Sequence, residues 1–192
     1  MNCDPARCSD GELAALTIAG RQDAFAEIMR RHRDPIYRLI RGYVGDAEEA
    51  VDLVQDCFTS AFKSLDRFDQ ARPLRAWLSR IAINKCRDWS RRRAVRQLVH
   101  WPAPASQTAA VPDPAPQLDE AAEDREELDR LWEALADLPR SIKEPLLLQA
   151  IEGLSQSEVA AVLRISEKAV ETRIYRARRK LASIRDDGRR SR

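Results

Sequence analysis

Large apolar residues recur every three or four positions along most of the chain, which is the spacing of one face of an α-helix. Between residues 12 and 43 this pattern predicts two amphipathic helices, separated near Gly20 because glycine weakens a helix. Their apolar positions are Leu13, Leu16, Phe25, Ile28, Met29, Ile36, Leu39, Ile40 and Tyr43. No segment shows the strict alternation of a strand, so the pattern predicts an all-α fold.

A third helix is predicted after Asp46, whose carboxylate can accept the first free amides of a helix. Its apolar face consists of Ala47, Ala50, Val51, Val54, Cys57, Phe58, Ala61, Phe62 and Leu65. Its opposite face is polar and carries Glu49, Asp52, Gln55, Asp56, Thr59 and Lys63. Such a polar face either binds a partner or simply faces solvent, and the pattern alone is compatible with both.

Pro73 is well placed in the first turn of a fourth helix, where its missing amide hydrogen is no loss. The predicted core face of this helix is Leu74, Trp77, Leu78, Ile81 and Trp89. Another side carries Arg80, Asn84, Arg87 and Arg91, followed by Arg92, Arg93 and Arg96. A row of hydrogen-bond donors of this kind suits a phosphate backbone. The alternative is a basic helix end that faces only solvent.

Residues 101–118 contain five prolines and no helical period, which predicts an extended, flexible linker. Beyond them, Leu128, Leu131, Trp132, Leu135 and Leu138 indicate another amphipathic helix that stops near Pro139. We therefore expect two small helical domains, at residues 10–96 and 125–187, joined by a proline-rich acidic linker at 97–124.

The segment 153–181 predicts two short helices joined by a tight turn. Ser155 and Glu158 have the spacing of a capping box at the start of the first helix, and Ser166 can cap the second. On the second helix, Val170, Ile174, Ala177 and Leu181 share one narrow stripe, whereas Lys168, Thr172, Tyr175, Arg176 and Arg179 point away from it. This pattern is typical of a helix-turn-helix, whose second helix enters the major groove of DNA. The alternative is an ordinary solvated surface helix.

Charge is segregated along the chain although the net charge is only +2. Residues 72–96 hold nine Arg or Lys and one acid, whereas residues 111–130 hold eight acids and two bases.

No apolar run reaches the roughly 20 residues that a membrane-spanning helix needs, so we expect a soluble, cytoplasmic protein. Four cysteines and two histidines offer no convincing metal site, and we expect no cofactor. No nucleophile with a base and no phosphate-binding loop is evident, which argues against an enzyme.

Three segments in this order resemble the extracytoplasmic-function (ECF) sigma factors, the smallest group of the sigma-70 family of bacterial transcription initiation factors. They are DLVQDCF at 52–58, WLSRIAINKCRDWSRRR at 77–93, and Leu138-Pro139 followed by EGLSQSEVAAVLRISEKAVETRIYRARRKL. The resemblance implies a sigma region 2 and a sigma region 4, and covers nearly the whole chain apart from the first ten residues and the linker. It also implies that the helix with Asp52, Gln55 and Asp56 docks on the coiled coil of the largest subunit of core RNA polymerase.

By the same resemblance, the fourth helix and the loop before it melt the −10 promoter element and capture an extruded base. Ser64, Phe68 and Asn84 match the pocket positions, with Phe68 as an apolar wall and Asn84 as a hydrogen-bonding group. Phe68 could instead cover the core. The positions expected to hold the phosphates of the separated strand are Arg80, Arg87, Arg91 and Arg92.

The resemblance further implies that the second helix of the helix-turn-helix reads the −35 element. The positions that match those facing base edges are Glu171, Thr172 and Arg176. The positions that match those facing the DNA backbone are Lys168 and Arg173, and Arg179 lies among the later cations that follow phosphates. Glu171 departs from the basic residue common in the family. A carboxylate at this position can accept a hydrogen bond from the amino group of cytosine, but it would repel phosphate. Val51 and Pro145 are further departures, and Pro145 could start its helix rather than break it.

The implied partners are core RNA polymerase, through its coiled coil and flap, promoter DNA, and an anti-sigma factor that could be anchored in the inner membrane. Two other classes compete with this interpretation. A two-domain helix-turn-helix regulator would bind duplex DNA without polymerase, usually as a dimer. A recombinase-type enzyme would need a cluster of catalytic residues that the sequence does not offer.

Overall fold

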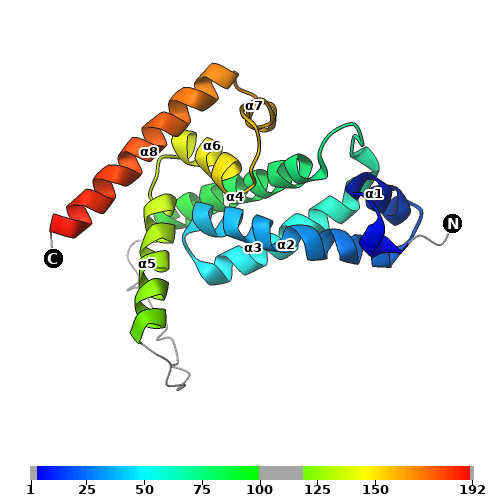
Figure 1. Cartoon of the computed structure of the whole chain (residues 1–192), viewed down its shortest axis with the longest axis horizontal. Coiled ribbons are helices and arrows are strands. Elements are labelled where there is room, and N and C mark those ends of the chain that lie inside the picture. The colour runs from blue at the N-terminus through cyan, green and yellow to red at the C-terminus, as the bar shows by residue number, and fades with distance from the viewer. Residues whose placement is uncertain (1–3, 100–118, 191–192) are drawn as a thin grey trace.

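The computed structural model describes residues 4–99 and 119–190, and these residues form helices and connecting turns without a strand (Figure 1). The N-terminal part contains η1 (Pro5–Arg7), α1 (Asp10–Ile18), α2 (Gln22–Val44), α3 (Ala47–Lys63), η2 (Leu65–Arg67) and α4 (Leu74–Val99). The C-terminal part contains α5 (Asp119–Ala136), α6 (Arg140–Ala150), α7 (Gln156–Leu163) and α8 (Glu167–Arg190). The predicted all-α fold of two small helical domains is confirmed.

The predicted linker falls largely on residues 100–118, which lie outside the described residues. At its two ends, α4 continues to Val99 and α5 begins at Asp119, so both helices extend into the range 97–124. The domain boundaries given above stay a prediction. Within the described part of the chain, no helix is both long enough and apolar enough to span a membrane.

The ends of the N-terminal helices follow from local sequence signals. Ser9 caps α1 in a capping box with Glu12, and the carboxylate of Asp46 accepts the amide hydrogen of Glu49 at 2.9 Å at the start of α3. Gly20 separates α1 from α2 and has a φ of 95°, a left-handed conformation that glycine adopts without strain. The two helices predicted within residues 12–43 are confirmed.

The core of the N-terminal domain forms where α2, α3 and α4 pack against one another, with α1 covering one end (Figure 1). Its largest fully buried side chains are Leu13, Ile28, Ile36, Leu39, Ile40, Leu65, Leu78 and Ile83. Cys57 is also buried, as expected for a small core residue, and burial raises the pKa of its thiol to about 12.

The prediction of the apolar face of α3 was wrong at its margins. Val51 and Phe62 are exposed by 43% and 51%, whereas Leu53, assigned to neither face, is buried. At 100° per residue, Val51 and Phe62 lie at one margin of the apolar stripe and Leu53 at the other. The neighbouring helices cover the Leu53 margin, and the exposed ring of Phe62 packs edge-on against Phe25 at 5.0 Å between ring centroids.

Arg31 of α2 ties the N-terminal segment to the helical bundle. Its guanidinium donates to the backbone carbonyls of Cys8 at 2.8 Å and Ala6 at 3.1 Å. The carboxylate of Glu27, one turn earlier in α2, accepts hydrogen bonds from both Arg30 and Arg31 at 2.7 Å. These hydrogen bonds, the one from Arg30 first, lower the pKa of Glu27 to about 2.

The depressed pKa of Glu27 predicts a specific acid dependence of stability. Its contribution is fully present above pH 4.5, the ordinary pKa of the group, and is lost as the pH falls toward 2. We expect the difference in free energy of unfolding between the wild type and Glu27→Gln to shrink over this range, as measured by urea titrations at several pH values. Glu133→Gln, at an exposed position of α5, serves as the control. A difference that does not depend on pH would contradict the assignment.

The two domains contact each other along one side of the N-terminal bundle. Helix α2 packs against α5 and α6, and α4 packs against α7 (Figure 1). The buried apolar side chains of the C-terminal domain belong to the same hydrophobic cluster as those of the N-terminal domain; they are Leu135, Leu138, Leu146, Leu147, Leu148, Leu154, Val159, Ala160, Val162, Val170, Ile174 and Ala177. Helix α6 begins at Arg140 and continues through Pro145, so Pro145 neither starts nor ends it.

Candidate nucleic-acid and protein interfaces

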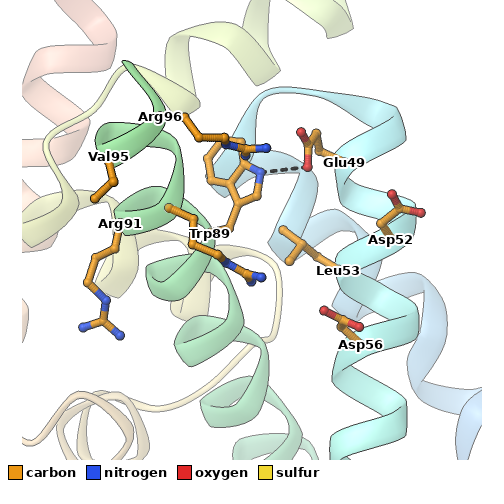
Figure 2. A pocket seen from close by; sticks show the side chains of 9 residues that line it. Glu49, Asp52, Leu53, Asp56, Trp89, Arg91, Val95 and Arg96 are labelled. Atoms are coloured by element: carbon orange, nitrogen blue, oxygen red, sulfur yellow. Dashed lines mark hydrogen bonds between the residues drawn. The ribbon is translucent and has the colours of Figure 1, made fainter. Parts of the chain in front are cut away.

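The acidic face of α3 borders an open hollow between α3 and α4, with a volume of about 590 Å³ (Figure 2). Asp52 and Asp56 line it from α3 and are exposed, and Gln55 is exposed on the same helix outside the lining. The apolar part of the lining consists of Leu53, Trp89 and Val95, and the remaining side chains are Glu49, Arg91, Arg92 and Arg96.

A hydrogen bond between Trp89 and Glu49 closes one end of this hollow (Figure 2). The indole Nε1–H of Trp89 donates to Oε2 of Glu49 at 2.8 Å, and the guanidinium of Arg93 lies 5.1 Å above the indole ring. The bond joins α3 to α4 and holds acids on one wall opposite arginines on the other. The hollow can therefore accept a partner that presents apolar side chains together with charges of both signs.

The residues of α4 that are predicted to contact DNA divide into two groups. Asn84, Arg91 and Arg92 are exposed and Arg80 is half-buried, so these four are available to a ligand. Asp88 pairs with Arg91 on the helix surface. Arg87 instead forms a two-point ion pair with Glu144 of α6, with Nε–Oε1 at 2.9 Å and Nη2–Oε2 at 2.6 Å. The structure thus separates Arg87 from the other predicted phosphate ligands.

Two of the three residues predicted to form a base pocket have partners inside the domain. Phe68 is 8% exposed and its ring lies 5.4 Å from that of Trp77, so in this conformation it covers the core. The hydroxyl of Ser64 donates to the backbone carbonyl of Ser60 at 2.7 Å. The burial of Phe68 agrees with the second of its two predicted roles, and base capture stays a prediction.

The C-terminal domain contains the predicted helix-turn-helix. Ser155 and Glu158 form both bonds of the capping box on α7, and the hydroxyl of Ser166 accepts the amide of Ala169 at 3.2 Å. Between the helices, Arg164 has a φ of 58°, which reverses the chain within a few residues. Val170, Ile174 and Ala177 of α8 are buried.

The face of α8 opposite the buried stripe is exposed and carries Lys168, Glu171, Thr172, Tyr175, Arg176 and Arg179. Arg173 is half-buried beside this face. The ammonium of Lys168 pairs with Glu171 at 3.0 Å, so the carboxylate that departs from the family pattern has a cation next to it. Tyr175, which was not among the predicted DNA contacts, is 62% exposed, and Arg179 lies 5.9 Å above its ring. An exposed aromatic residue within a basic row is a signal for a further nucleic-acid contact, and the sequence alone could have indicated Tyr175 as a candidate.

Comparisons with known proteins assign these two domains to a family. Residues 28–96 match the model of Sigma-70 region 2, and residues 128–181 match the model of Sigma-70 region 4. The chain is 40% identical over 183 residues to RNA polymerase sigma factor CnrH of Cupriavidus metallidurans, a match that covers 93% of this chain and 95% of CnrH. It is 32% identical to ECF RNA polymerase sigma factor SigM of Mycobacterium tuberculosis, over 92% of this chain and 84% of SigM. The chain belongs to the ECF sigma factors of the sigma-70 family.

Solved structures agree with this assignment. The structure of CnrH in complex with the cytosolic domain of CnrY matches with a TM-score of 0.69 and 36% identity, over 93% of this chain and 97% of that one. The co-crystal structure of the sigma factor RpoE with the anti-sigma factor NepR from Bartonella quintana matches with a TM-score of 0.67. At 23% identity, that second likeness shows the fold alone.

The predicted resemblance to ECF sigma factors is confirmed, and the predicted site residues of the sigma factor fall inside the two matched regions. The residues predicted to bind polymerase and the −10 element lie in region 2, and those predicted to bind the −35 element lie in region 4. Within region 2 the acids of α3 and Arg91 and Arg92 of α4 line the same hollow. The sequence did not indicate this, because the two groups lie in different helices whose relative rotation is set by packing.

Proposed function

We propose that this sigma factor binds core RNA polymerase, recognises the −10 and −35 elements of its promoters, and helps to open the DNA. The observation that carries the proposal is the presence of two separate basic surfaces, on α4 and on α8, in domains that match regions 2 and 4. A protein that only reads duplex DNA has no use for the surface on α4. The protein adds specificity to polymerase and does no chemistry of its own.

The proposed roles follow the exposed groups of each surface. Asp52, Gln55 and Asp56 of α3 contact the coiled coil of the largest polymerase subunit, and region 4 contacts the flap. Asn84 and the arginines of α4 bind the separated −10 strand. The exposed row of α8, from Lys168 to Arg179, enters the major groove at the −35 element. The partly neutralised Glu171 is compatible with a position near a cytosine amino group.

We further propose that an anti-sigma factor controls this protein. The relative CnrH supports this, because its solved structure is a complex with the cytosolic domain of CnrY. Such a partner would compete with polymerase for the hollow between α3 and α4. The protein would then act in the cytoplasm and could be held at the inner membrane when that partner is membrane-anchored.

A triple variant tests the role of α4 in promoter opening. Replacing Arg80, Arg91 and Arg92 by alanine removes three candidate phosphate contacts of roughly 1 kcal/mol each, so we expect open complexes and run-off transcripts to fall about 100-fold. For single-stranded −10 DNA, the slope of log affinity against log salt should fall by about 2. Binding of the holoenzyme to a −35 duplex should not change. Permanganate reactivity of the −10 thymines measures the opening directly.

The control replaces Arg7 and Arg33, which are exposed arginines of η1 and α2, and should leave opening unchanged. Normal opening by the triple variant would contradict the proposed role of α4.

Gel-shift assays distinguish a sigma factor from the competing class, a helix-turn-helix regulator that binds duplex DNA without polymerase. Tight duplex binding by the free protein, unaffected by core polymerase, would favour that class over a sigma factor.

A further inference from the structure

The exposed row of α8 carries a single acid within an otherwise basic stretch. From Lys168 to Arg179, Glu171 is the one acid beside five Lys or Arg residues. Its side chain is 57% exposed, so it is not held there by packing. A carboxylate in a row that binds DNA repels the phosphates and lowers the affinity for every sequence alike. This cost is offset only where the carboxylate makes a favourable contact with a particular base.

Lys168 determines where the carboxylate of Glu171 lies. The ammonium of Lys168 donates to Oε2 of Glu171 at 3.0 Å across one turn of α8. An exposed pair of this kind adds little to stability, so its main effects are to orient the carboxylate and to offset part of its repulsion of phosphate. The pair turns the carboxylate toward the N-terminal end of α8. In a helix-turn-helix, this end of the second helix lies closest to the base edges.

Thr172, the neighbour of Glu171, has no hydrogen left to donate to a base. Its hydroxyl donates to the backbone carbonyl of Lys168 at 2.9 Å. A hydroxyl has one hydrogen, so the exposed side chain of Thr172 can offer a base only the lone pairs of its oxygen and its methyl group. An ionised Glu171 is also an acceptor only. These two adjacent side chains therefore present acceptors and a methyl group, but no donor.

The four bases differ in what they offer to such acceptors in the major groove. Guanine presents two acceptors there, and thymine presents an acceptor and a methyl group. Adenine presents an amino donor next to the acceptor N7, whereas cytosine presents an amino donor and no acceptor of its own. A carboxylate is repelled by the acceptors of guanine, thymine and adenine. Cytosine is therefore the base that suits Glu171 best.

We propose that Glu171 is a specificity residue of this sigma factor, and that it accepts a hydrogen bond from the amino group of a cytosine in the −35 element. The inference rests on the proposed entry of α8 into the major groove and names a base that α8 selects there. Thr172 adds no donor that would favour guanine or thymine. Arg176, exposed one turn beyond Thr172, donates and suits guanine instead. The −35 elements of this protein thus contain a C·G pair whose cytosine faces Glu171.

Selection of DNA by the holoenzyme tests this role. Core polymerase with the full chain is incubated with a duplex promoter library whose −35 region is randomised, and the bound DNA is sequenced. We expect the wild type to enrich one fixed cytosine. Glu171→Gln should lower the preference for this cytosine about tenfold and raise that for adenine, because a glutamine amide pairs with both N6 and N7 of adenine. Preferences at the other positions should not change.

Two further variants separate a direct contact from an effect of charge. Glu171→Asp keeps the charge but is one methylene shorter, so the preference for cytosine should fall while the affinity averaged over the library stays the same. Glu133→Gln, at an exposed position of α5, changes the net charge as Glu171→Gln does and should alter no base preference. Circular dichroism establishes that each variant is folded.

The failure of this inference and the failure of the proposed function give different results. If the wild-type holoenzyme enriches a −35 sequence and Glu171→Gln binds all sequences more tightly with the same base preferences, Glu171 is only a solvated side chain and the inference alone is overturned. If the wild-type holoenzyme enriches no sequence in the randomised region, α8 does not read a −35 element. The proposed function of α8 then fails together with the role of Glu171.

Discussion

Exchanging Asp52 and Asp56 for arginine is expected to weaken binding of this sigma factor to core RNA polymerase by about 100-fold or more. Both carboxylates are exposed on α3 and line the hollow between α3 and α4. Placing like charges opposite each other across an interface costs several kcal/mol, and about 3 kcal/mol corresponds to 100-fold. The fold should tolerate the change because both positions face solvent. Fluorescence anisotropy with labelled core enzyme measures the affinity.

The control reverses two acids on other exposed surfaces, Asp34 of α2 and Glu133 of α5, and changes the net charge equally. We expect this variant to bind polymerase with nearly the affinity of the wild type, which separates a local contact from long-range attraction. If instead the α3 variant binds normally, these acids are merely solvated side chains and the hollow is not the docking site.

Replacing Leu78 by alanine is expected to lower the free energy of unfolding by about 2–5 kcal/mol. Leu78 has 0% exposure and lies in α4, in the core that α4 forms with α2 and α3. The loss combines the transfer free energy of the removed methyl groups with the cavity that they leave. Urea denaturation followed by both circular dichroism and tryptophan fluorescence measures the change.

Val95→Ala is the matched control, because Val95 lies in the same helix and is 59% exposed. Its effect should stay within about 0.5 kcal/mol. A loss at Leu78 of less than 1 kcal/mol would mean that the core of the N-terminal domain closes around the cavity. Burial of Leu78 would then contribute less to stability than its complete removal from solvent implies.

Features encoded by neighbouring residues could be predicted from the sequence. The capping box at Ser155, the break at Gly20 and the buried stripe of α8 each depend on residues within one or two turns. The exposed row of α8 follows from the same helical period. These signals were sufficient for the fold class and for the assignment of the helix-turn-helix.

Features that depend on contacts between distant segments could not be predicted. Arg87 and Glu144 are 57 positions apart, and nothing local marks an arginine in a basic row as the one that is paired. The exposure of Val51 and Phe62 depends on the rotation of α3 against its neighbours, which periodicity does not define. Pro145 could not be placed because a proline is compatible with either a helix start or an interruption.

The ammonium of Lys143 in α6 donates to the backbone carbonyl of Tyr43, near the end of α2, and to that of Ala136, the last residue of α5, and this position has a thermodynamic consequence. One ammonium completes the final turn of a helix in each domain, so fraying of either end removes a partner from the other. We therefore expect melting of the two domains to be coupled.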